Sequence, residues 1–323
     1  MKFSFTILLI CWAFSAFSAQ PVLRVKNHKF KIVQFTDLHL IHGPKFTAQN
    51  DSTYELMRYI IKNEHPDLVV ITGDIVVSGR AAEVWAQLVR PMNEAAVPFA
   101  VTFGNHDTET GLSKPALLKL IQKNRYNLTF NANNKLAGTG NCSLPILDSE
   151  GKNRSFALYL FDSQAYTNDS TLGYYDWIKN NQVQWYRKQS ELYAKQEGKK
   201  IPALAFFHIP LPEFEVVRLQ KTTVGNVTEP VSSATINSGL FSSFYEMGDI
   251  RGVFVGHDHN SDFIGSLNGI RLGFGRKTGY ASAYHEILKR GARVIELDEK
   301  ENKIDTYIRT IAGTEFEYSF TMK

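Results

Sequence analysis

The chain has 323 residues, of which 43% are hydrophobic, 12% aromatic and 21% charged, an ordinary composition for a globular protein. The formal charge is +4, and lysine and arginine are scattered along the chain. Nucleic-acid-binding surfaces need clustered basic residues, so we expect no nucleic acid as a partner. No repeat, low-complexity tract or linker divides the chain, and the sequence therefore predicts a single domain behind a short leader.

Residues 1–19 have the pattern of a secretory signal peptide. Lys2 supplies a short positive start, residues 3–17 are almost continuously apolar, and small residues follow. The apolar stretch is shorter than the ~20 residues that a transmembrane helix needs, although an uncleaved anchor is the alternative. We therefore expect a mature domain over residues 20–323, without a stable membrane span, that is secreted or lumenal in an endomembrane compartment.

Six Asn-x-Ser/Thr sequons follow the leader, and none has proline in the middle position. Each sequon alone is a weak signal, but together with a signal peptide they predict a glycoprotein. Four of them fall between residues 127 and 168, which we expect to be a surface elaboration. The mature chain would keep only Cys142, because Cys11 lies in the leader, so no intrachain disulfide is expected. The candidate acceptors are Asn50, Asn127, Asn141, Asn153, Asn168 and Asn226.

Short β-rich apolar runs alternate with helix-like segments over the first hundred residues of the predicted domain. This order predicts right-handed crossovers and a parallel sheet core. Residues 108–154 look less regular, and the tail from residue 262 onward is typical of short antiparallel strands. In chain order we predict a strand at 31–36, a helix at 53–64, a strand at 67–72, a helix at 81–96, a strand at 98–103, a helix at 114–123, a strand at 155–161, a helix at 174–195, strands at 202–207 and 250–255, and tail strands around 263 and at 270–274, 292–297 and 304–310.

A set of polar residues comes directly after these predicted strands. The functional crevice of an open α/β sheet lies outside the carboxyl ends of its strands, so these side chains should converge. Carboxylate, amide and imidazole groups together suit two metal ions that share one carboxylate, and two metals about 3.5–4 Å apart can hold a phosphoryl group for in-line displacement. The candidate ligands are Asp37, His39, Asp74, Asn105, His208, His257 and His259.

The residues next to these ligands in the sequence predict how some of the ligand side chains are oriented. Asp37 and His39 are two residues apart, as are His257 and His259, so an extended strand end would place each pair on one face. The glycine before Asp74 allows a sharp backbone turn, from which a carboxylate can bridge two cations.

The order Asp-x-His, Gly-Asp, Gly-Asn-His-Asp, His and Gly-His-x-His resembles the calcineurin-like metallophosphoesterase family, from about residue 31 to residue 297. The resemblance implies an α/β fold with four layers, in which two mixed β-sheets are flanked by helices in a single domain. It implies catalytic roles for His106, which would lie over the substrate and donate a proton, and for Asp107 behind the ligands. One implied metal site comprises Asp37, His39, Asp74 and His259, and the other comprises Asp74, Asn105, His208 and His257, with Asp74 bridging.

The branch within this family can be narrowed by two positions. Purple acid phosphatases carry a tyrosine ligand three residues after the bridging aspartate, where this chain has Val77. They also have glycine where this chain has His39. The runs at 206–213 and 275–280 resemble a purple-acid-phosphatase-related branch that lacks the tyrosine. The resemblance therefore implies a centre without tyrosinate colour, whose two divalent or transition metal ions could be Mn, Fe or Zn.

The resemblance implies a phosphoesterase in which two metals lower the pKa of a bridging water, so that hydroxide attacks phosphorus. A phosphomonoester of a small molecule is the expected substrate, and Arg276 and Lys277 are expected to contact its phosphate. A phosphodiesterase acting on nucleotides or phospholipid head groups is one alternative. A catalytically silent binding protein with the same fold is another. The sequence leaves the oligomeric state open.

Overall fold

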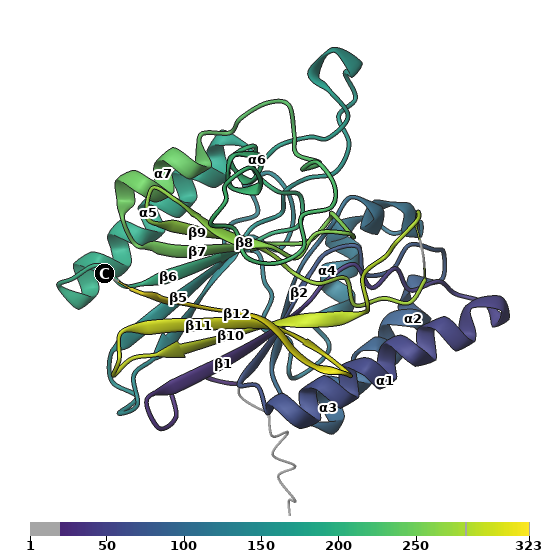
Figure 1. Ribbon diagram of the computed structural model, residues 1–323, viewed down its shortest axis with the longest axis horizontal. Helices are drawn as coiled ribbons and strands as arrows, with labels where there is room; N and C mark the ends of the chain where they lie inside the picture. The colour runs from purple at the N-terminus through teal and green to yellow at the C-terminus, as the bar shows by residue number, and fades with distance from the viewer. Residues whose placement is uncertain (1–19, 282, 323) are drawn as a thin grey trace, which may run out of the picture.

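The computed structural model describes residues 20–281 and 283–322, so the predicted signal peptide lies outside the described residues. Two six-stranded β-sheets lie face to face, and helices cover the outer face of each sheet (Figure 1). Three apolar clusters fill the spaces between the four layers. The predicted α/β sandwich of two mixed sheets flanked by helices, in a single domain, is confirmed.

The first sheet has the strand order β12-β11-β10-β1-β2-β3. β1, β2 and β3 are parallel, as the strand–helix alternation predicts, and the tail strands β10 to β12 extend the sheet antiparallel from β1. The strands are β1 (Lys29–Phe35), β2 (Leu68–Thr72), β3 (Phe99–Thr102), β10 (Gly291–Asp298), β11 (Lys303–Thr310) and β12 (Gly313–Thr321).

The second sheet has the strand order β4-β5-β6-β7-β9-β8. Its central strands β5, β6, β7 and β9 are parallel, while the two edge strands are antiparallel to their neighbours. The strands are β4 (Cys142–Leu147), β5 (Arg154–Leu160), β6 (Ala203–Phe206), β7 (Ile250–Val255), β8 (Ile264–Leu267) and β9 (Ile270–Phe274).

The helices form the two outer layers. Helices α1 to α4 pack on the first sheet, and α5 to α7 pack on the second (Figure 1). They are α1 (Thr47–Glu64), α2 (Ala81–Leu88), α3 (Arg90–Glu94), α4 (Lys114–Ile121), α5 (Asn180–Glu197), α6 (Glu213–Arg218) and α7 (Leu240–Met247), with 3-10 turns η1 (Pro44–Phe46), η2 (His106–Thr110) and η3 (Ser170–Leu172).

Strand β2 shows why the sequences of the parallel strands are unbroken runs of apolar residues. All five of its residues are buried. Val69 and Ile71 face the helices, whereas Leu68 and Val70 face the second sheet. Successive side chains of a strand point to opposite faces, so a strand covered on both sides needs apolar residues at every position.

The structure corrects several predicted elements. The predicted helix at 81–96 is divided into α2 and α3, because Pro91 starts a new first turn and has no N–H to continue the old one. The predicted helix at 174–195 begins only at Asn180, and the preceding residues form a loop beside the functional site. Strands β4 and β12 and helices α6 and α7 were not predicted, because their short runs carry little periodicity.

The region between residues 127 and 168 is not a surface elaboration, contrary to the prediction. It contains β4 and β5, and Cys142 lies in the core between the sheets, where burial raises the pKa of its thiol to about 12. The side chains of Asn127 and Asn141 are buried, and their amides donate to the backbone oxygens of Thr129 and Ala137. A glycan at either asparagine would therefore need the folded core to open.

The other sequons have different surroundings. Asn153 and Asn168 are exposed. Asn50 and Asn226 are half-buried, and their amides donate to the backbone oxygen of Ile41 and to Asp262. Among the described residues, no helix is both long enough and apolar enough to cross a membrane.

Candidate metal centre

All the predicted ligands lie in loops at the carboxyl ends of the parallel strands of both sheets. The first sheet contributes the loops after β1, β2 and β3, and the second sheet contributes the loops after β6 and β7. The packing of one sheet against the other brings these loop ends together, and every predicted ligand is buried there. They are Asp37, His39, Asp74, Asn105, His208, His257 and His259.

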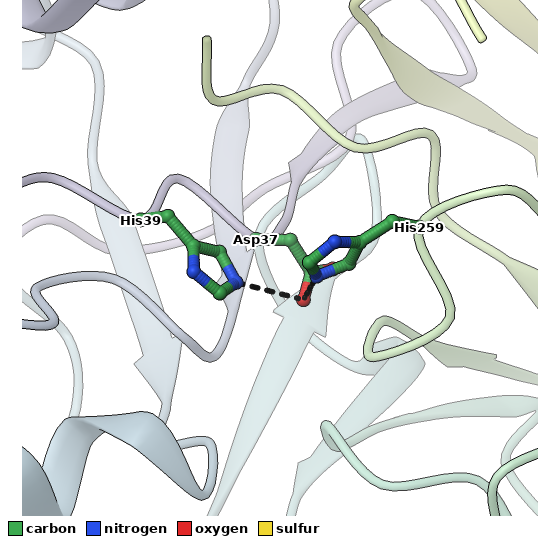
Figure 2. A group of neighbouring side chains, drawn as sticks. All are labelled: Asp37, His39 and His259. Atoms are coloured by element: carbon green, nitrogen blue, oxygen red, sulfur yellow. Dashed lines mark ion pairs between the residues drawn. The ribbon is translucent and has the colours of Figure 1, made fainter. Parts of the chain in front are cut away.

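The side chains form two groups that could each hold a metal ion. Asp37, His39 and His259 form the first group, which Figure 2 shows converging on the carboxylate of Asp37. The carboxylate oxygen Oδ1 of Asp37 lies 3.4 Å from His259 Nε2 and 3.9 Å from His39 Nε2. The second group comprises Asp74, His208 and His257. The ligand atoms within each group all lie within 4.8 Å of one another.

The carboxylate of Asp74 lies between the two groups. Its Oδ2 is 3.1 Å from Nε2 of His208 in the second group and 3.6 Å from Nε2 of His39 in the first. Its other oxygen, Oδ1, accepts a hydrogen bond from the backbone N–H of His106 at 2.9 Å. Oδ2 is therefore placed where a single carboxylate can serve both groups.

Three buried atoms of the ligand set have no hydrogen-bond partner within the described residues. These atoms are His39 Nε2, Asn105 Oδ1 and His257 Nε2. Buried polar atoms in folded proteins are nearly always paired, so three such atoms around two close carboxylates indicate a site for cations. Imidazole nitrogens with carboxylate and amide oxygens suit first-row transition metals, and the residues present thus fit a dinuclear centre.

The backbone at the site adopts a conformation that the spacing argument does not predict. Asp37 and His39 have φ angles of 52° and 46°, so they lie in the left-handed region and not on an extended strand end. Asp74 and His257 are also left-handed, at 49° and 85°. His257 and His259 consequently serve different groups. Aspartate and histidine tolerate this region better than most residues, but each such residue still costs of order 1–3 kcal/mol.

Glycines precede three ligands because the ligands of neighbouring loops occupy the space beside them. A Cβ at Gly73 would lie 2.5 Å from His208 Nδ1. A Cβ at Gly104 would overlap Oδ1 of Asp74, and one at Gly256 would overlap the hydroxyl of Thr36. The Gly-Asp, Gly-Asn and Gly-His pairs of the sequence are therefore explained by close packing of the loops.

Two histidines are oriented by hydrogen bonds behind the site. Nδ1 of His208 donates to the backbone oxygen of Thr72 at 2.7 Å, which leaves Nε2 facing Asp74. Nδ1 of His259 lies 2.7 Å from Glu286 Oε1, which leaves Nε2 facing Asp37. Such partners fix the ring orientation of metal-binding histidines and raise their basicity.

The pKa values of the buried histidines shift in opposite directions. Burial lowers the pKa of His257 to about 3, and burial together with Lys277 lowers the pKa of His39 well below its ordinary value. Burial also opposes a charge on His208, but the carboxylate of Asp74 outweighs it and raises the pKa of His208 to about 9. His39 and His257 therefore have the neutral imidazole that metal binding requires.

His106 is the most accessible predicted site residue, with a side chain that is 34% exposed. Its ring lies 5.3 Å from that of His39, and its Nδ1 is 2.8 Å from Oε1 of Glu109. This contact leaves Nε2 as the nitrogen available to a bound molecule. His106 therefore lies beside the first ligand group, and its role toward a substrate stays a prediction.

Asp107 does not reach the site. Its Oδ1 accepts from the backbone N–H groups of Ile75 and Val76 at 3.0 and 3.2 Å, and its Oδ2 accepts from that of Gly104 at 2.8 Å. Burial, together with the nearby charge of Asp74, raises the pKa of Asp107 to about 6. Asp107 therefore ties together the two loops that carry Asp74 and Asn105, and it is not placed to touch a substrate.

Arg276 and Lys277, the predicted phosphate contacts, both lie in the interior of the structure. Arg276 is 2% exposed, and its guanidinium donates to Asp262, Glu315 and the backbone oxygen of Lys289. Lys277 is 1% exposed, and its Nζ donates to the backbone oxygen of Asp37 at 3.1 Å. Both cations therefore have protein partners in the folded chain, and their contact with a phosphate stays a prediction.

Sequence reasoning missed four residues that surround the ligands. Glu109 and Tyr166 contact His106, and the Tyr166 hydroxyl also accepts from Asn105 Nδ2 at 2.8 Å. Glu286 and Tyr284 hold His259. Glu109 lies three residues from His106 on one helical turn, a spacing that gives a local signal. The other three come from distant loops and carry no such signal.

Comparison with known proteins matches this architecture and its motifs. A profile described as calcineurin-like phosphoesterase matches residues 30–261. A relative in Arabidopsis thaliana, named probable inactive purple acid phosphatase 29, is 33% identical, and the match covers 84% of this chain and 77% of the relative. Phosphatase DCR2 of Saccharomyces cerevisiae is 30% identical, and the match covers 90% of this chain and 55% of that protein.

Two solved structures share the fold. A dimetal phosphatase from Danio rerio superposes with a TM-score of 0.63 at 12% identity, covering 91% of this chain and 99% of that one. A purple acid phosphatase from yellow lupin seeds superposes with a TM-score of 0.53 at 14% identity, covering 91% of this chain and 54% of that one. At these identities the likeness shows the fold alone.

Proposed function

The chain belongs to the calcineurin-like phosphoesterase family, and on this premise we propose that it is a metal-dependent phosphomonoesterase with a dinuclear centre. The position of Asp74 carries the proposal, because one carboxylate oxygen lies near histidines of both ligand groups. The two ligand groups, and three ligand atoms that have no hydrogen-bond partner among the described residues, support the binding of two cations. The residues that would hold the metals are those predicted from the sequence, with Asp74 shared.

Two bound divalent cations would supply a nucleophilic water near neutral pH and would polarise the phosphoryl oxygens. The chain's own residues would donate the proton and position the ligand loops. His106 is placed to donate a proton or hydrogen bond to the ester oxygen, and Glu109 would orient its ring. Asp107 would hold the ligand loops in register through three backbone hydrogen bonds.

A catalytically silent binding protein is the second candidate, because the Arabidopsis relative is named probable inactive. The ligand set of this chain favours activity over that alternative. The carboxylates and imidazoles of the two groups and the amide of Asn105 are all buried, and His106 keeps an accessible ring.

The test pairs metal quantification with hydrolysis of p-nitrophenyl phosphate and bis-p-nitrophenyl phosphate, before and after chelation. We expect about two metals per chain, the usual content of such clamps, and chelator-sensitive turnover that favours the monoester. A preference for the diester would instead support a phosphodiesterase. Absence of metal and turnover after reloading with Mn, Fe and Zn would contradict the proposal and favour the silent alternative.

The variant His106→Ala separates chemistry from metal binding. We expect it to keep both metals but to lower kcat by about 10²–10⁴-fold, the usual contribution of an acid–base group. Loss of metal in this variant would show that His106 is a ligand. Lys119→Ala, on the exposed side of α4, is the matched control and should keep both metals and turnover.

We also propose that the protein enters the secretory pathway, on the basis of the leader-like residues 1–19, and that glycans are carried at Asn153 and Asn168. These two sequons support the proposal because they are exposed in the folded chain. Expression in a eukaryotic cell with peptide mass mapping tests both points. An unmodified protein that keeps residues 1–19 would contradict them.

A further inference from the structure

A row of aromatic rings leads from the metal-ligand groups to the protein surface. The ring of Tyr175 meets that of His257 edge-on at 4.5 Å. Tyr174 contacts Tyr175 at 4.9 Å and Tyr166 at 5.2 Å. Tyr166 in turn lies 6.2 Å from His106. The three tyrosines therefore form one aromatic wall between a ligand of the second group and the accessible histidine.

The wall is built on an ordered loop. Residues 165–176 fold back on themselves, with backbone hydrogen bonds from Thr167 to Tyr174 at 3.1 Å and from Asp176 to Ala165 at 3.0 Å. Asp169 caps the 3-10 turn at the end of the loop, its side chain accepting from the backbone N–H of Thr171. The rings are thus held before any ligand arrives, which lowers the entropy cost of binding one.

A hydrogen bond fixes the wall relative to the ligands. The Tyr166 hydroxyl accepts from Nδ2 of Asn105, a predicted metal ligand, and it donates to Glu109 at 3.1 Å. Movement of the loop would therefore disturb Asn105 and the partner of His106. The aromatic surface has a defined distance from the reacting centre.

Tyr174 is the outer member of the wall and is 68% exposed. Its ring contacts that of Tyr175, which in turn contacts that of His257. A large aromatic side chain exposed at the rim of a site offers a flat apolar surface that water solvates poorly. A second exposed ring, Tyr284, lies against the other ligand group, stacked on His259 at 4.7 Å with an angle of 10° between the planes.

We propose that Tyr174 is a stacking platform for the leaving group, so that the protein selects phosphate esters whose alcohol carries a planar aromatic ring. The inference rests on the proposed phosphoesterase function and adds its substrate class. The phosphate would bind at the ligand groups, and the ring would lie on Tyr174, one side-chain layer away from His257. A nucleotide base and a benzylic ring are two sources of this shared chemistry.

Matched substrate pairs test the platform. Adenosine monophosphate and ribose 5-phosphate differ by the base alone, and benzyl phosphate and cyclohexylmethyl phosphate differ by the planarity of the ring. We expect kcat/KM to favour the aromatic member of at least one pair by about fivefold to tenfold, the factor that aromatic stacking contributes. The pair that shows the preference identifies the source of the ring. Equal kcat/KM within both pairs would overturn the proposal.

Variants of Tyr174 assign the preference to this ring. Tyr174→Ala should bring the ratio within the discriminating pair close to one through KM, whereas Tyr174→Phe should keep it. Tyr245→Ala on α7 is the matched control, because Tyr245 is 61% exposed and α7 packs on the outer face of the second sheet. A ratio that survives in Tyr174→Ala, or that falls equally in the control, would overturn the role of Tyr174.

Binding separates failure of the platform from failure of the proposed function. If none of the esters is hydrolysed, calorimetry with the metal-loaded protein measures the affinities of adenosine monophosphate and ribose 5-phosphate directly. Tighter binding of the nucleotide that Tyr174→Ala abolishes would support the platform in a silent binding protein. In a protein that hydrolyses none of the esters, equal affinities within this pair and within the benzyl and cyclohexylmethyl pair would overturn the proposal.

Discussion

The two sheets contribute different chemistry to the site and hold it in different ways. The loops of the first sheet supply all the oxygen ligands, from Asp37, Asp74 and Asn105, and their conformation is set by the backbone. The loops of the second sheet supply only imidazoles, and two of these rings are oriented by distant partners, the backbone oxygen of Thr72 and the carboxylate of Glu286. The first half of the site is therefore built by local backbone geometry, and the second half depends on tertiary contacts.

The largest expected effect comes from removing the group that joins the two halves. Asp74→Asn should lose both metals and all metal-dependent turnover, because the shared carboxylate lies near both groups. His259→Ala should lose the first metal alone, since the second group does not include it. Metal quantification of the two folded variants checks this difference. Equal losses would show that the groups do not bind independently.

A smaller effect on metal binding is expected from Glu286, which orients the imidazole of His259 in a loop of the second sheet. Glu286→Gln weakens the partner of His259 Nδ1 and should lower the affinity for one metal by about 10–100-fold, with activity restored by added metal. Metal titration of the apoprotein measures this change. Glu94→Gln, which breaks a surface pair with Arg58 between α1 and α3, is the control and should leave affinity unchanged. An unchanged affinity in Glu286→Gln would remove Glu286 from the site.

The smallest expected effect is on stability and comes from Asp107, whose carboxylate holds two loops of the first sheet together. Asp107→Asn places an amide N–H₂ against backbone N–H donors, and the unsatisfied groups should lower the free energy of unfolding by about 1–3 kcal/mol. Denaturant unfolding of the apoprotein measures the loss. Asp305→Asn, in a surface pair with Lys303, should cost less than about 1 kcal/mol. Similar losses in both variants would contradict the buried role of Asp107.

The sequence predicts the central strands of both sheets, because their burial leaves a clear pattern of apolar residues. Strands such as β2 and β7 are buried on both faces, so their apolar runs stand out from the surrounding chain. Edge strands lack that signal: β12 alternates exposed with half-buried residues, and β4 lies in a region rich in asparagine and glycine. The division of the predicted helix at 81–96 follows from Pro91, which the sequence does contain.

The candidate ligands could be predicted because each directly follows a strand, and the carboxyl ends of parallel strands meet at one edge. The spacing of the ligands along the chain does not predict which of them lie in the same group. The expectation that His257 and His259 share one face fails because His257 is left-handed and the pair divides between the groups. Spacing also gave no sign that Arg276 and Lys277 are buried against Asp262 and the backbone oxygen of Asp37.

The sequence by itself determined which residues could bind metal, the order in which they follow the strands, and the glycines that make room for them. Residue spacing alone did not divide the ligands around Asp74, a division that the family resemblance implied, and the distant groups that support them became visible in the folded chain. Glu286, Tyr284 and Tyr166 reach the site by hydrogen bonds across long stretches of chain. Such contacts follow from the packing of the two sheets, which no local spacing encodes.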